Sequence, residues 1–199
     1  LYVLGDGSSS LITNTIFNST SELRDGILQL TGGVTFYNSD LIISNSHFNN
    51  ASGEDALNII KSEFAIDNLI INGTYSDGLD FDFSSGFMID SIFSNVGGDA
   101  VDVSGGNVRL SDMLIKDVRD KGISAGEGSK VNIESSKISK VGVGIASKDG
   151  SEVKAKSTSI LESNLFDLMT YSKKNFFDKS SLIFVNERQE NVTSARQIN

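Results

Sequence analysis

A four-residue motif returns along this chain at a constant interval of 22 residues, and this regularity constrains the fold more than any other feature. The copies begin at Asp55, Asp77, Asp99, Lys121 and Val143 and read DALN, DGLD, DAVD, KGIS and VGIA. A fixed interval of this length is typical of repeat proteins, in which each unit buries its apolar residues against its neighbours. The sequence therefore predicts a stack of equivalent units.

Apolar residues recur at nearly the same interval and define the expected interior. One series contains Phe64, Phe87, Val108, Val131 and Val153, and its partner two residues on contains Ile66, Ile89, Leu110, Ile133 and Ala155. A third series contains Phe17, Phe48, Ile71, Phe93, Ile115, Ile138 and Ile160. The step from Phe17 to Phe48 is longer than the others, which predicts an insertion around residues 31–38.

Within each unit, apolar and polar residues alternate over short stretches that Gly, Ser, Asn and Asp separate. Alternation with a period of two indicates strands. Three short strands per unit predict an all-β fold, a right-handed parallel β-helix of about eight coils over residues 1–185. The absence of proline fits this fold, because each coil donates its N–H groups to the next. Gly78, Gly122 and Gly144 share one corner, which is expected to need a small residue or a positive φ.

The two ends differ from the middle of the chain. The repeat is already under way at Leu1, so we expect further coils before it in the parent protein. The repeat weakens after about Ser163, and residues 186–199 are polar and without periodicity. They are predicted to form a C-terminal tail or cap, because a terminal coil would otherwise expose unpaired strand edges.

Composition excludes several classes of function. The chain has no cysteine, so it can form no disulfide, thiolate zinc site or cysteine nucleophile. Its single histidine, His47, shares a column with Ile70, Ile92 and Leu114, and it is expected to be structural at a coil edge. A net charge of −9 argues against nucleic acid as a partner, and no apolar run is long enough for membrane insertion.

Aspartates concentrate in the first motif copies and are predicted to stack. Asp55, Asp77 and Asp99 form one column, and Asn58, Asp80 and Asp102 form the next. Two interpretations remain open. These aspartates can cap turns by accepting backbone N–H groups, or they can bind calcium, which would offset their repulsion. The calcium ligands would be Asp77, Asp80, Asp99 and Asp102. Lys121 continues the first column, where it can pair with Asp99.

The same columns resemble the motifs of the polygalacturonase family. SDGLD at 76–80 resembles N-T-D-G-I-D, and GDA at 98–100 resembles G-D-D. DKGIS at 120–124 and IASK at 145–148 stand where the family has G-H-G-I-S and R-I-K. The resemblance implies a right-handed β-helix and would give catalytic roles to Asp77 and Asp99. Ala100 and Lys121 replace a carboxylate and the histidine of that family, so the resemblance supports the fold rather than the hydrolysis.

A polysaccharide lyase is the better enzymatic alternative. β-Helical polysaccharide lyases abstract a proton with a Lys or Arg base while calcium neutralises the uronate. Lys121 or Lys148 would be that base, and the four aspartates would hold the calcium ion. The competing interpretation is that these lysines pair with neighbouring aspartates. The short loops between Asp55 and Gly150 favour it, because they cannot wall a substrate groove.

A second resemblance covers more of the chain. The segments DGLDFDFSSG, GGDAVDVSGG, DKGISAGEGSKV, GVGIASKDGSEV and YSKKNFF resemble a right-handed β-helix module of large bacterial surface or secreted proteins, including ones with an upstream spore-coat CotH-type kinase domain. The resemblance implies a non-catalytic structural or interaction module that is extracellular or on the cell surface. Its expected partners are a polysaccharide, or neighbouring copies or domains at the coil ends.

Overall fold

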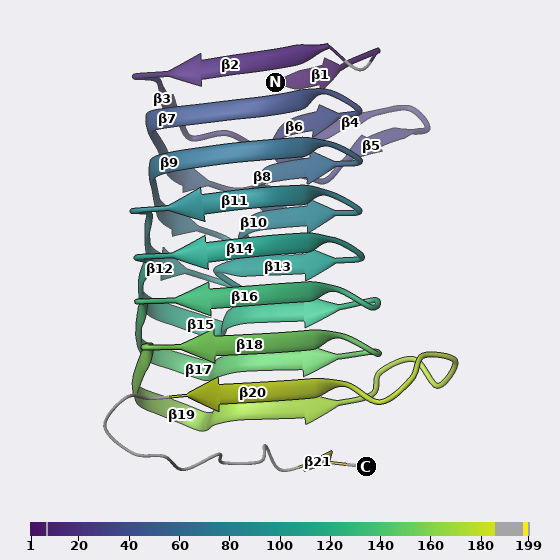
Figure 1. The fold of residues 1–199 in the computed structure, drawn as a ribbon. Helices are drawn as coiled ribbons and strands as arrows, with labels where there is room; N and C mark the ends of the chain where they lie inside the picture. Colours follow the sequence, from purple (N-terminus) through teal and green to yellow (C-terminus); the bar gives the residue numbers. More distant parts are fainter. Residues whose placement is uncertain (7, 186–196, 199) are drawn as a thin grey trace.

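A computed structural model describes residues 1–6, 8–185 and 197–198 of the chain. The strands wind into a solenoid with three sheets, called faces A, B and C, and each coil adds one strand to every face (Figure 1). Strands pair in parallel from coil to coil, and their register follows the 22-residue interval. Leu79, for example, pairs with Leu57 on one side and with Val101 on the other.

Most strands belong to a single face. Face A contains β1 (Tyr2–Leu4), β6 (Gly32–Tyr37), β8 (Asp55–Ile60), β10 (Asp77–Asp82), β13 (Val101–Ser104) and β21 (Gln197–Ile198). Face B contains β2 (Ser9–Thr13), β11 (Ser85–Ile89), β14 (Asn107–Ser111), β16 (Lys130–Glu134), β18 (Glu152–Lys156) and β20 (Ser181–Val185). Face C contains β3 (Ile16–Asn18) and β12 (Ile92–Val96).

Five longer strands bend around a corner and contribute to two faces. Strands β7 (Asp40–Ala51) and β9 (Glu63–Thr74) run from face B into face C. Strands β15 (Leu114–Gly126), β17 (Lys137–Lys148) and β19 (Ser159–Tyr171) run from face C into face A.

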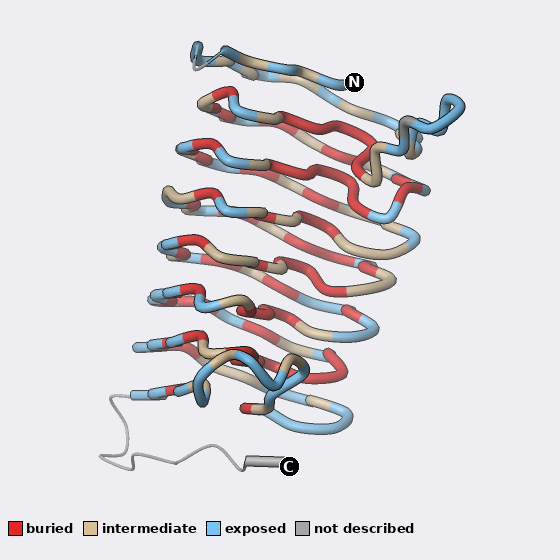
Figure 2. The backbone as a smooth tube through the Cα atoms, turned by 90° about the vertical axis from the view of Figure 1, so that its right-hand side faces the viewer, coloured by how far each residue is buried: buried red, intermediate tan, exposed pale blue. Residues whose placement is uncertain are grey.

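Apolar residues fill the interior, and buried positions repeat at equivalent places in successive coils (Figure 2). The predicted column from Phe17 to Ile160 is confirmed, because each member pairs in register with the next. At its N-terminal end the rings of Phe17 and Phe48 stack with their centroids 4.5 Å apart. Like residues therefore lie directly over one another inside the solenoid.

The prediction for the other two apolar columns is wrong at β11. Gly86 rather than Phe87 pairs with Phe64, and Met88 rather than Ile89 pairs with Ile66. A Cβ on Gly86 would come 2.8 Å from the Phe64 ring, so the glycine leaves room for that ring. Phe64 uses this room to stack on Phe81, with ring centroids 4.1 Å apart. Phe87 consequently points outward and is 44% exposed.

The insertion near the N-terminus lies earlier in the chain than residues 31–38. Most of that segment is β6, a regular rung in which Val34 pairs with Leu57. The extra residues form a hairpin of β4 (Leu23–Asp25) and β5 (Leu28–Leu30). These two strands pair antiparallel, whereas the other strand pairs among the described residues are parallel. The spacing between Phe17 and Phe48 gives the length of an insertion but not its position, which explains the misplacement.

The corners between faces B and C are made by single residues in the left-handed region. Asn45, Asn68, Asp90, Asp112 and Ser135 occupy equivalent positions there, with φ between 48° and 54°. Asn and Asp adopt this conformation more readily than other non-glycine residues, because their short side chains can hydrogen-bond locally. The Asn and Asp spacers of the repeat therefore have a conformational role at these corners.

The glycine column at the start of face A has another cause. Gly78, Gly122 and Gly144 are absent from the positive-φ positions. A Cβ on Gly78 or Gly122 would lie 2.7 Å from a carbonyl oxygen of the next coil. Close backbone approach, rather than a positive φ, requires the small residue.

Buried serines complete the corner between faces A and B. The Ser62 hydroxyl accepts the N–H of Ser39 at 3.0 Å, and the Ser84 hydroxyl accepts the N–H of Ser62 at 3.1 Å. The contact between Ser129 and Ser151 repeats the contact between Ser62 and Ser84 three coils further on. These serines satisfy N–H groups where the strand ladder is interrupted.

The ends of the stack depart from the regular pattern. There are slightly fewer complete coils than the eight expected, and the coil that contains β20 has no strand on face C among the described residues. Residues 186–196 and 199 of the predicted tail lie outside the described residues, whereas β21 pairs in parallel with β19.

His47 is half-buried and pairs with Ile70, in the column expected. The described residues include no helix that is long and apolar enough to cross a membrane.

Candidate functional site

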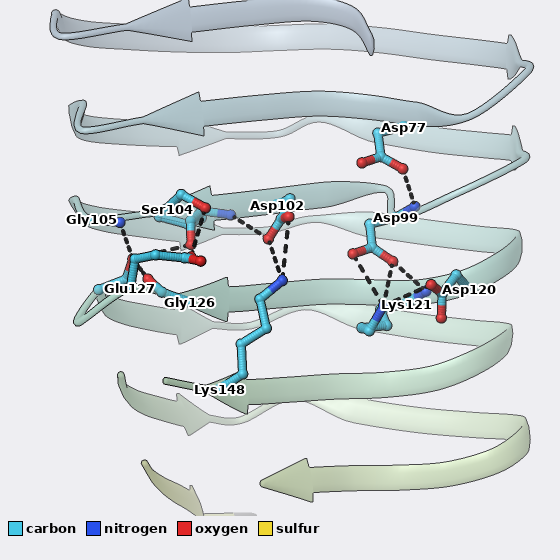
Figure 3. A network of polar contacts seen from close by, with 12 residues as sticks. Asp77, Asp99, Asp102, Ser104, Gly105, Asp120, Lys121, Gly126, Glu127 and Lys148 are labelled. Carbon is cyan, nitrogen blue, oxygen red and sulfur yellow. Dashed lines mark hydrogen bonds and ion pairs between the residues drawn. The ribbon is translucent and has the colours of Figure 1, made fainter. Parts of the chain in front are cut away.

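Three of the aspartates predicted to stack, Asp77, Asp99 and Asp102, lie close together on face A (Figure 3). Alternate side chains of a strand point to opposite sides of the sheet, so Asn58, Asp80 and Asp102 face outward, opposite to the buried residues that precede them. Asp80 pairs with Asn58 of the preceding coil and with Asp102 of the following one, and Asp77 pairs with Asp55. The two predicted polar columns are therefore present.

One oxygen of each central aspartate binds a backbone N–H. Asp77 Oδ1 accepts the N–H of Asp99 at 2.8 Å, and Asp99 Oδ1 accepts the N–H of Lys121 at 2.9 Å. Each carboxylate satisfies a donor of the next coil at the same corner, which is the turn-capping role considered for these residues. The recurrence of Asp every 22 residues thus has a structural cause.

Lys121 forms ion pairs with two carboxylates. Its Nζ lies 3.1 Å from Asp99 Oδ1 and 2.7 Å from Asp120 Oδ2. The side chains of Lys121 and Asp99 are only 14% and 7% exposed, whereas that of Asp120 is 55% exposed. The pair with Asp99 is therefore largely removed from water, and the loss of either partner would leave a buried charge.

Lys148 reaches across an entire coil to Asp102. Its Nζ lies 3.5 Å from both carboxylate oxygens of Asp102, which precedes it by 46 positions. The aliphatic part of Lys148 crosses Gly126, where a Cβ would come 2.6 Å from Cε. Lys148 is buried along this path. A glycine in the intervening coil thus permits a contact between coils that are not adjacent.

Burial raises the pKa of several carboxyl groups on face A. The pKa of Asp80 rises to about 9 through burial and then through repulsion from Asp82 and Asp55. Burial and Asp77 raise the pKa of Asp55 to about 7. The pKa of Asp99 also rises to about 7, because burial outweighs the attraction of Lys121. At neutral pH this face carries less negative charge than its number of aspartates suggests.

The two lysines retain their protons. Burial alone would lower the pKa of Lys121, but Asp99 and Asp120 raise it above the ordinary value. Burial alone would also lower the pKa of Lys148, but Asp102 and more distant acidic groups raise it above the ordinary value. A general base must be unprotonated near the working pH. Lys121 and Lys148 do not meet this requirement.

Three of the four residues predicted to bind calcium come together. Asp77, Asp99 and Asp102 each offer an oxygen, and these oxygens lie within 4.8 Å of one another. Carboxylate oxygens suit Ca²⁺ and Mg²⁺, but two lysines already offset the charge of this group. Asp80 is not part of it. Its Oδ1 is buried and has no hydrogen-bond partner among the described residues, as is also true of Asn58 Oδ1 in the adjacent coil.

The polygalacturonase-like carboxylates take part in the stacking of the coils. In an inverting hydrolase, two carboxyl groups lie about 6.5–9.5 Å apart with a water molecule between them. Asp77 and Asp99 each accept a backbone N–H group of the next coil, and one oxygen of each lies within 4.8 Å of the other. Ala100, at the position of a family carboxylate, is fully buried. The structure therefore brings these residues together as a structural column.

Sequence reasoning missed a second polar cluster on the C-terminal side of face A. Lys174, in the loop after β19, forms an ion pair with Glu127, 47 positions earlier. Asp149 Oδ1 accepts the N–H groups of Lys173 and Lys174, each at 2.7 Å, which fastens that loop to the coil before it. Glu127–Lys174 and Asp102–Lys148 both span about two repeat intervals. A search for opposite charges at twice the interval could have found both pairs.

Comparison with known proteins agrees with this geometry. A family model described as a right handed beta helix region matches residues 56–195, which is well over half of the chain. The match supports the right-handed winding of the coils and includes Asp77, Asp80, Asp99, Asp102, Lys121 and Lys148. No curated protein matches the chain significantly.

Proposed function

Because the chain belongs to the right-handed β-helix family, we propose that it is a non-catalytic structural and interaction module of a bacterial extracellular or cell-surface protein. The fold supplies a long, regular surface with three sheet faces, on which side chains recur from coil to coil. Repeat arrays of this kind commonly act as extended binding surfaces. The module resemblance in its sequence is what suggests its location outside the cell.

One observation carries the non-catalytic assignment. Both lysines that could serve as bases are protonated and paired, Lys121 with Asp99 and Lys148 with Asp102. Asp99 is a carboxylate that a hydrolase would use, but its oxygens accept hydrogen bonds from the backbone N–H and the Nζ of Lys121. These groups support the coil stack, and a lyase or hydrolase that used them would need at least one of them free to exchange a proton.

A turnover assay tests this assignment against the lyase alternative. The wild-type chain, Lys121→Gln and Lys148→Gln are incubated with a panel of polyuronates, with and without calcium, and unsaturated products are followed by ultraviolet absorbance. We expect no product from any of the three proteins, and lower thermal stability in both variants. Product formation by the wild-type chain that disappears in Lys121→Gln would identify a lyase instead.

The proposed partners are a polysaccharide, or neighbouring copies or domains that meet the coil ends. The second possibility follows from the fold, because the edge strand of a β-sheet carries backbone groups that can pair with another strand. Light scattering over a range of concentrations tests it. Assembly through the ends predicts ordered oligomers that grow with concentration, and a constant monomer mass would leave the sides of the solenoid as the binding surface.

A further inference from the structure

Face B carries an exposed aromatic residue at the middle of a strand. Phe87 is the central residue of β11 and points away from the core. Its neighbours in the same outward column are Ala65 in the preceding coil and Arg109 in the following coil. The small side chain of Ala65 does not cover the ring. An aromatic ring that a strand presents to solvent contributes little to the core, and such residues often mark interaction sites.

A depression surrounds this residue. It has a volume of about 550 Å³ and is lined by Phe87, Arg109, Glu63, Asn107, Lys130 and Asn132, among others. Phe64 and Gly86 also line it. A second depression, shared by Phe87, Arg109 and Asn132, continues toward Glu134. The volume lies in the range of ligand sites, and the lining combines an apolar surface with a few polar groups.

The coils below Phe87 bear unpaired cations. Strands β14, β16 and β18 present Arg109, Lys130, Lys154 and Lys156 on face B, against the two carboxylates of Glu134 and Glu152. All four cationic residues are exposed, and none of them forms an ion pair within the part of the chain that the structure describes. Glu63 of β9 lies on the N-terminal side of the depression, so the excess of positive charge is confined to the coils that follow Phe87, on a chain whose net charge is −9.

From these observations we propose that face B binds a segment of an acidic polysaccharide, with Phe87 under the apolar face of a sugar ring and Arg109 paired with an acidic group. Asn107 and Asn132 supply donors and acceptors for hydroxyl groups, and Lys130 and Lys154 extend the positive surface along the axis. The inference rests on the proposed interaction function and names its ligand class and surface.

The charge and shape of face B favour this ligand over others. A neutral glycan would leave the cations without a partner, and a simple anion would not need Phe87. Successive coils repeat every ~4.8 Å, so a polymer along the axis meets Phe87 and Arg109 in adjacent coils and then the lysines of the following coils. The net negative charge of the chain opposes the approach of any polyanion, so binding depends on these local contacts.

Titration calorimetry tests the proposal with three probes. These are oligogalacturonate, its neutral methyl ester, and dextran sulfate as a polyanion with a different backbone. Each probe is titrated into the wild-type chain, Phe87→Ala, Arg109→Gln and the matched control Arg119→Gln. Arg119 is likewise exposed but lies in β15, away from face B. Both face B substitutions are at outward positions, and thermal melting verifies that each variant is folded.

We expect the wild-type chain to bind oligogalacturonate or dextran sulfate, and the preferred probe identifies the acidic group. The methyl ester should bind about tenfold more weakly than the free acid if carboxylates are preferred. Phe87→Ala and Arg109→Gln should each weaken binding about tenfold, and Arg119→Gln less than about twofold.

Three outcomes would overturn the proposal: binding to no acidic glycan, binding that Phe87→Ala leaves unchanged, and equal losses in Arg109→Gln and Arg119→Gln. The last two would indicate general attraction of polyanions. None of these results would imply catalysis. Turnover of oligogalacturonate would instead contradict the non-catalytic function, and the two failures are therefore distinguishable.

Discussion

At the scale of single residues, Asp80 makes the stability of the protein depend on pH. Its pKa is about 9 in the folded protein because of burial and neighbouring carboxylates, and 3.8 in its unperturbed state. Between these values the folded chain holds a proton that the unfolded chain has released. The free energy of unfolding therefore falls as pH rises from about 4 toward 9, by up to about 1.4 kcal/mol per pH unit for this group. Asp55 and Asp99 act in the same direction up to about pH 7.

Urea denaturation at a series of pH values tests this dependence. Asp80→Asn keeps the shape of the side chain and cannot ionise, so the variant should lose less stability than the wild-type chain between pH 5 and 8. We expect a difference on the order of 2 kcal/mol over this interval. Identical slopes for the two proteins would mean that Asp80 is ionised in the folded state throughout.

The pair of Lys121 and Asp99 allows a second test at the same scale. Lys121→Met removes the cation and leaves the Asp99 carboxyl buried without its partner. We expect a loss on the order of 2 kcal/mol in the free energy of unfolding. The double variant Lys121→Met/Asp99→Asn should recover part of it, because an asparagine oxygen can still accept the N–H of residue 121. Additive losses in the double variant would contradict this coupling.

Calcium binding by Asp77, Asp99 and Asp102 remains a prediction that thermal melting can test. A specific site raises the melting midpoint when calcium is added and lowers it again with a chelator, because the ion binds only the folded state. We expect the increase to be larger in Lys148→Met, whose Asp102 carboxylate is free of its lysine. A midpoint that calcium leaves unchanged in both proteins would assign these aspartates to turn capping alone.

At the scale of the strand, β11 shows how one small residue sets the direction of its neighbours. Gly86→Ala would place a Cβ 2.0 Å from the Phe64 carbonyl oxygen and 2.8 Å from its ring. We expect a loss of at least about 2 kcal/mol, since neither the backbone nor the stacked ring can move freely. Gly26→Ala is the control: it has φ of +59° but nothing within 4 Å of its Cβ, and should cost about 1 kcal/mol. Equal losses would show that crowding is unimportant at residue 86.

The same strand shows how far the sequence could be interpreted. The equal spacing of the DALN-like motifs gave the fold, the polar columns and the pairing of Lys121 with Asp99, because a constant interval implies a constant register. The prediction for Phe87 was wrong, because hydrophobicity alone favours burial. In the structure the ring of Phe64 occupies the interior at this level, and Phe87 points outward. The sequence allowed Lys148 to pair with a neighbouring aspartate but did not identify Asp102, because this contact skips a coil and depends on the missing side chain of Gly126.

At the scale of the whole molecule, the regular interval predicts that an entire coil can be removed. Deletion of residues 85–106 removes β11, β12 and β13 and joins Ser84 to Asn107 in the same corner register. It also brings Asp77 into the place of Asp99 beside Lys121, and Asp80 into the place of Asp102 near the Lys148 side chain. We expect a folded chain with a lower melting midpoint and a smaller denaturant m-value, because less surface is buried.

The control deletion covers residues 85–95, half of the interval. It brings together strands from different faces and reverses the inward and outward positions of the following residues, so we expect no cooperative unfolding transition. Circular dichroism and urea denaturation distinguish the two deletions. A folded half-coil deletion, or an unfolded full-coil deletion, would contradict the independence of the stacked coils.

The contacts of Lys148 and Lys174 also affect how the solenoid responds to mechanical load. In a simple stack each coil holds only its neighbours, so a force on one end would peel the coils off one at a time. Lys148 and Lys174 each join coils two apart, to Asp102 and Glu127. Ion pairs therefore link C-terminal coils that are not adjacent. A force applied to the C-terminal side has to break these ion pairs as well as the strand pairing before the last coil separates.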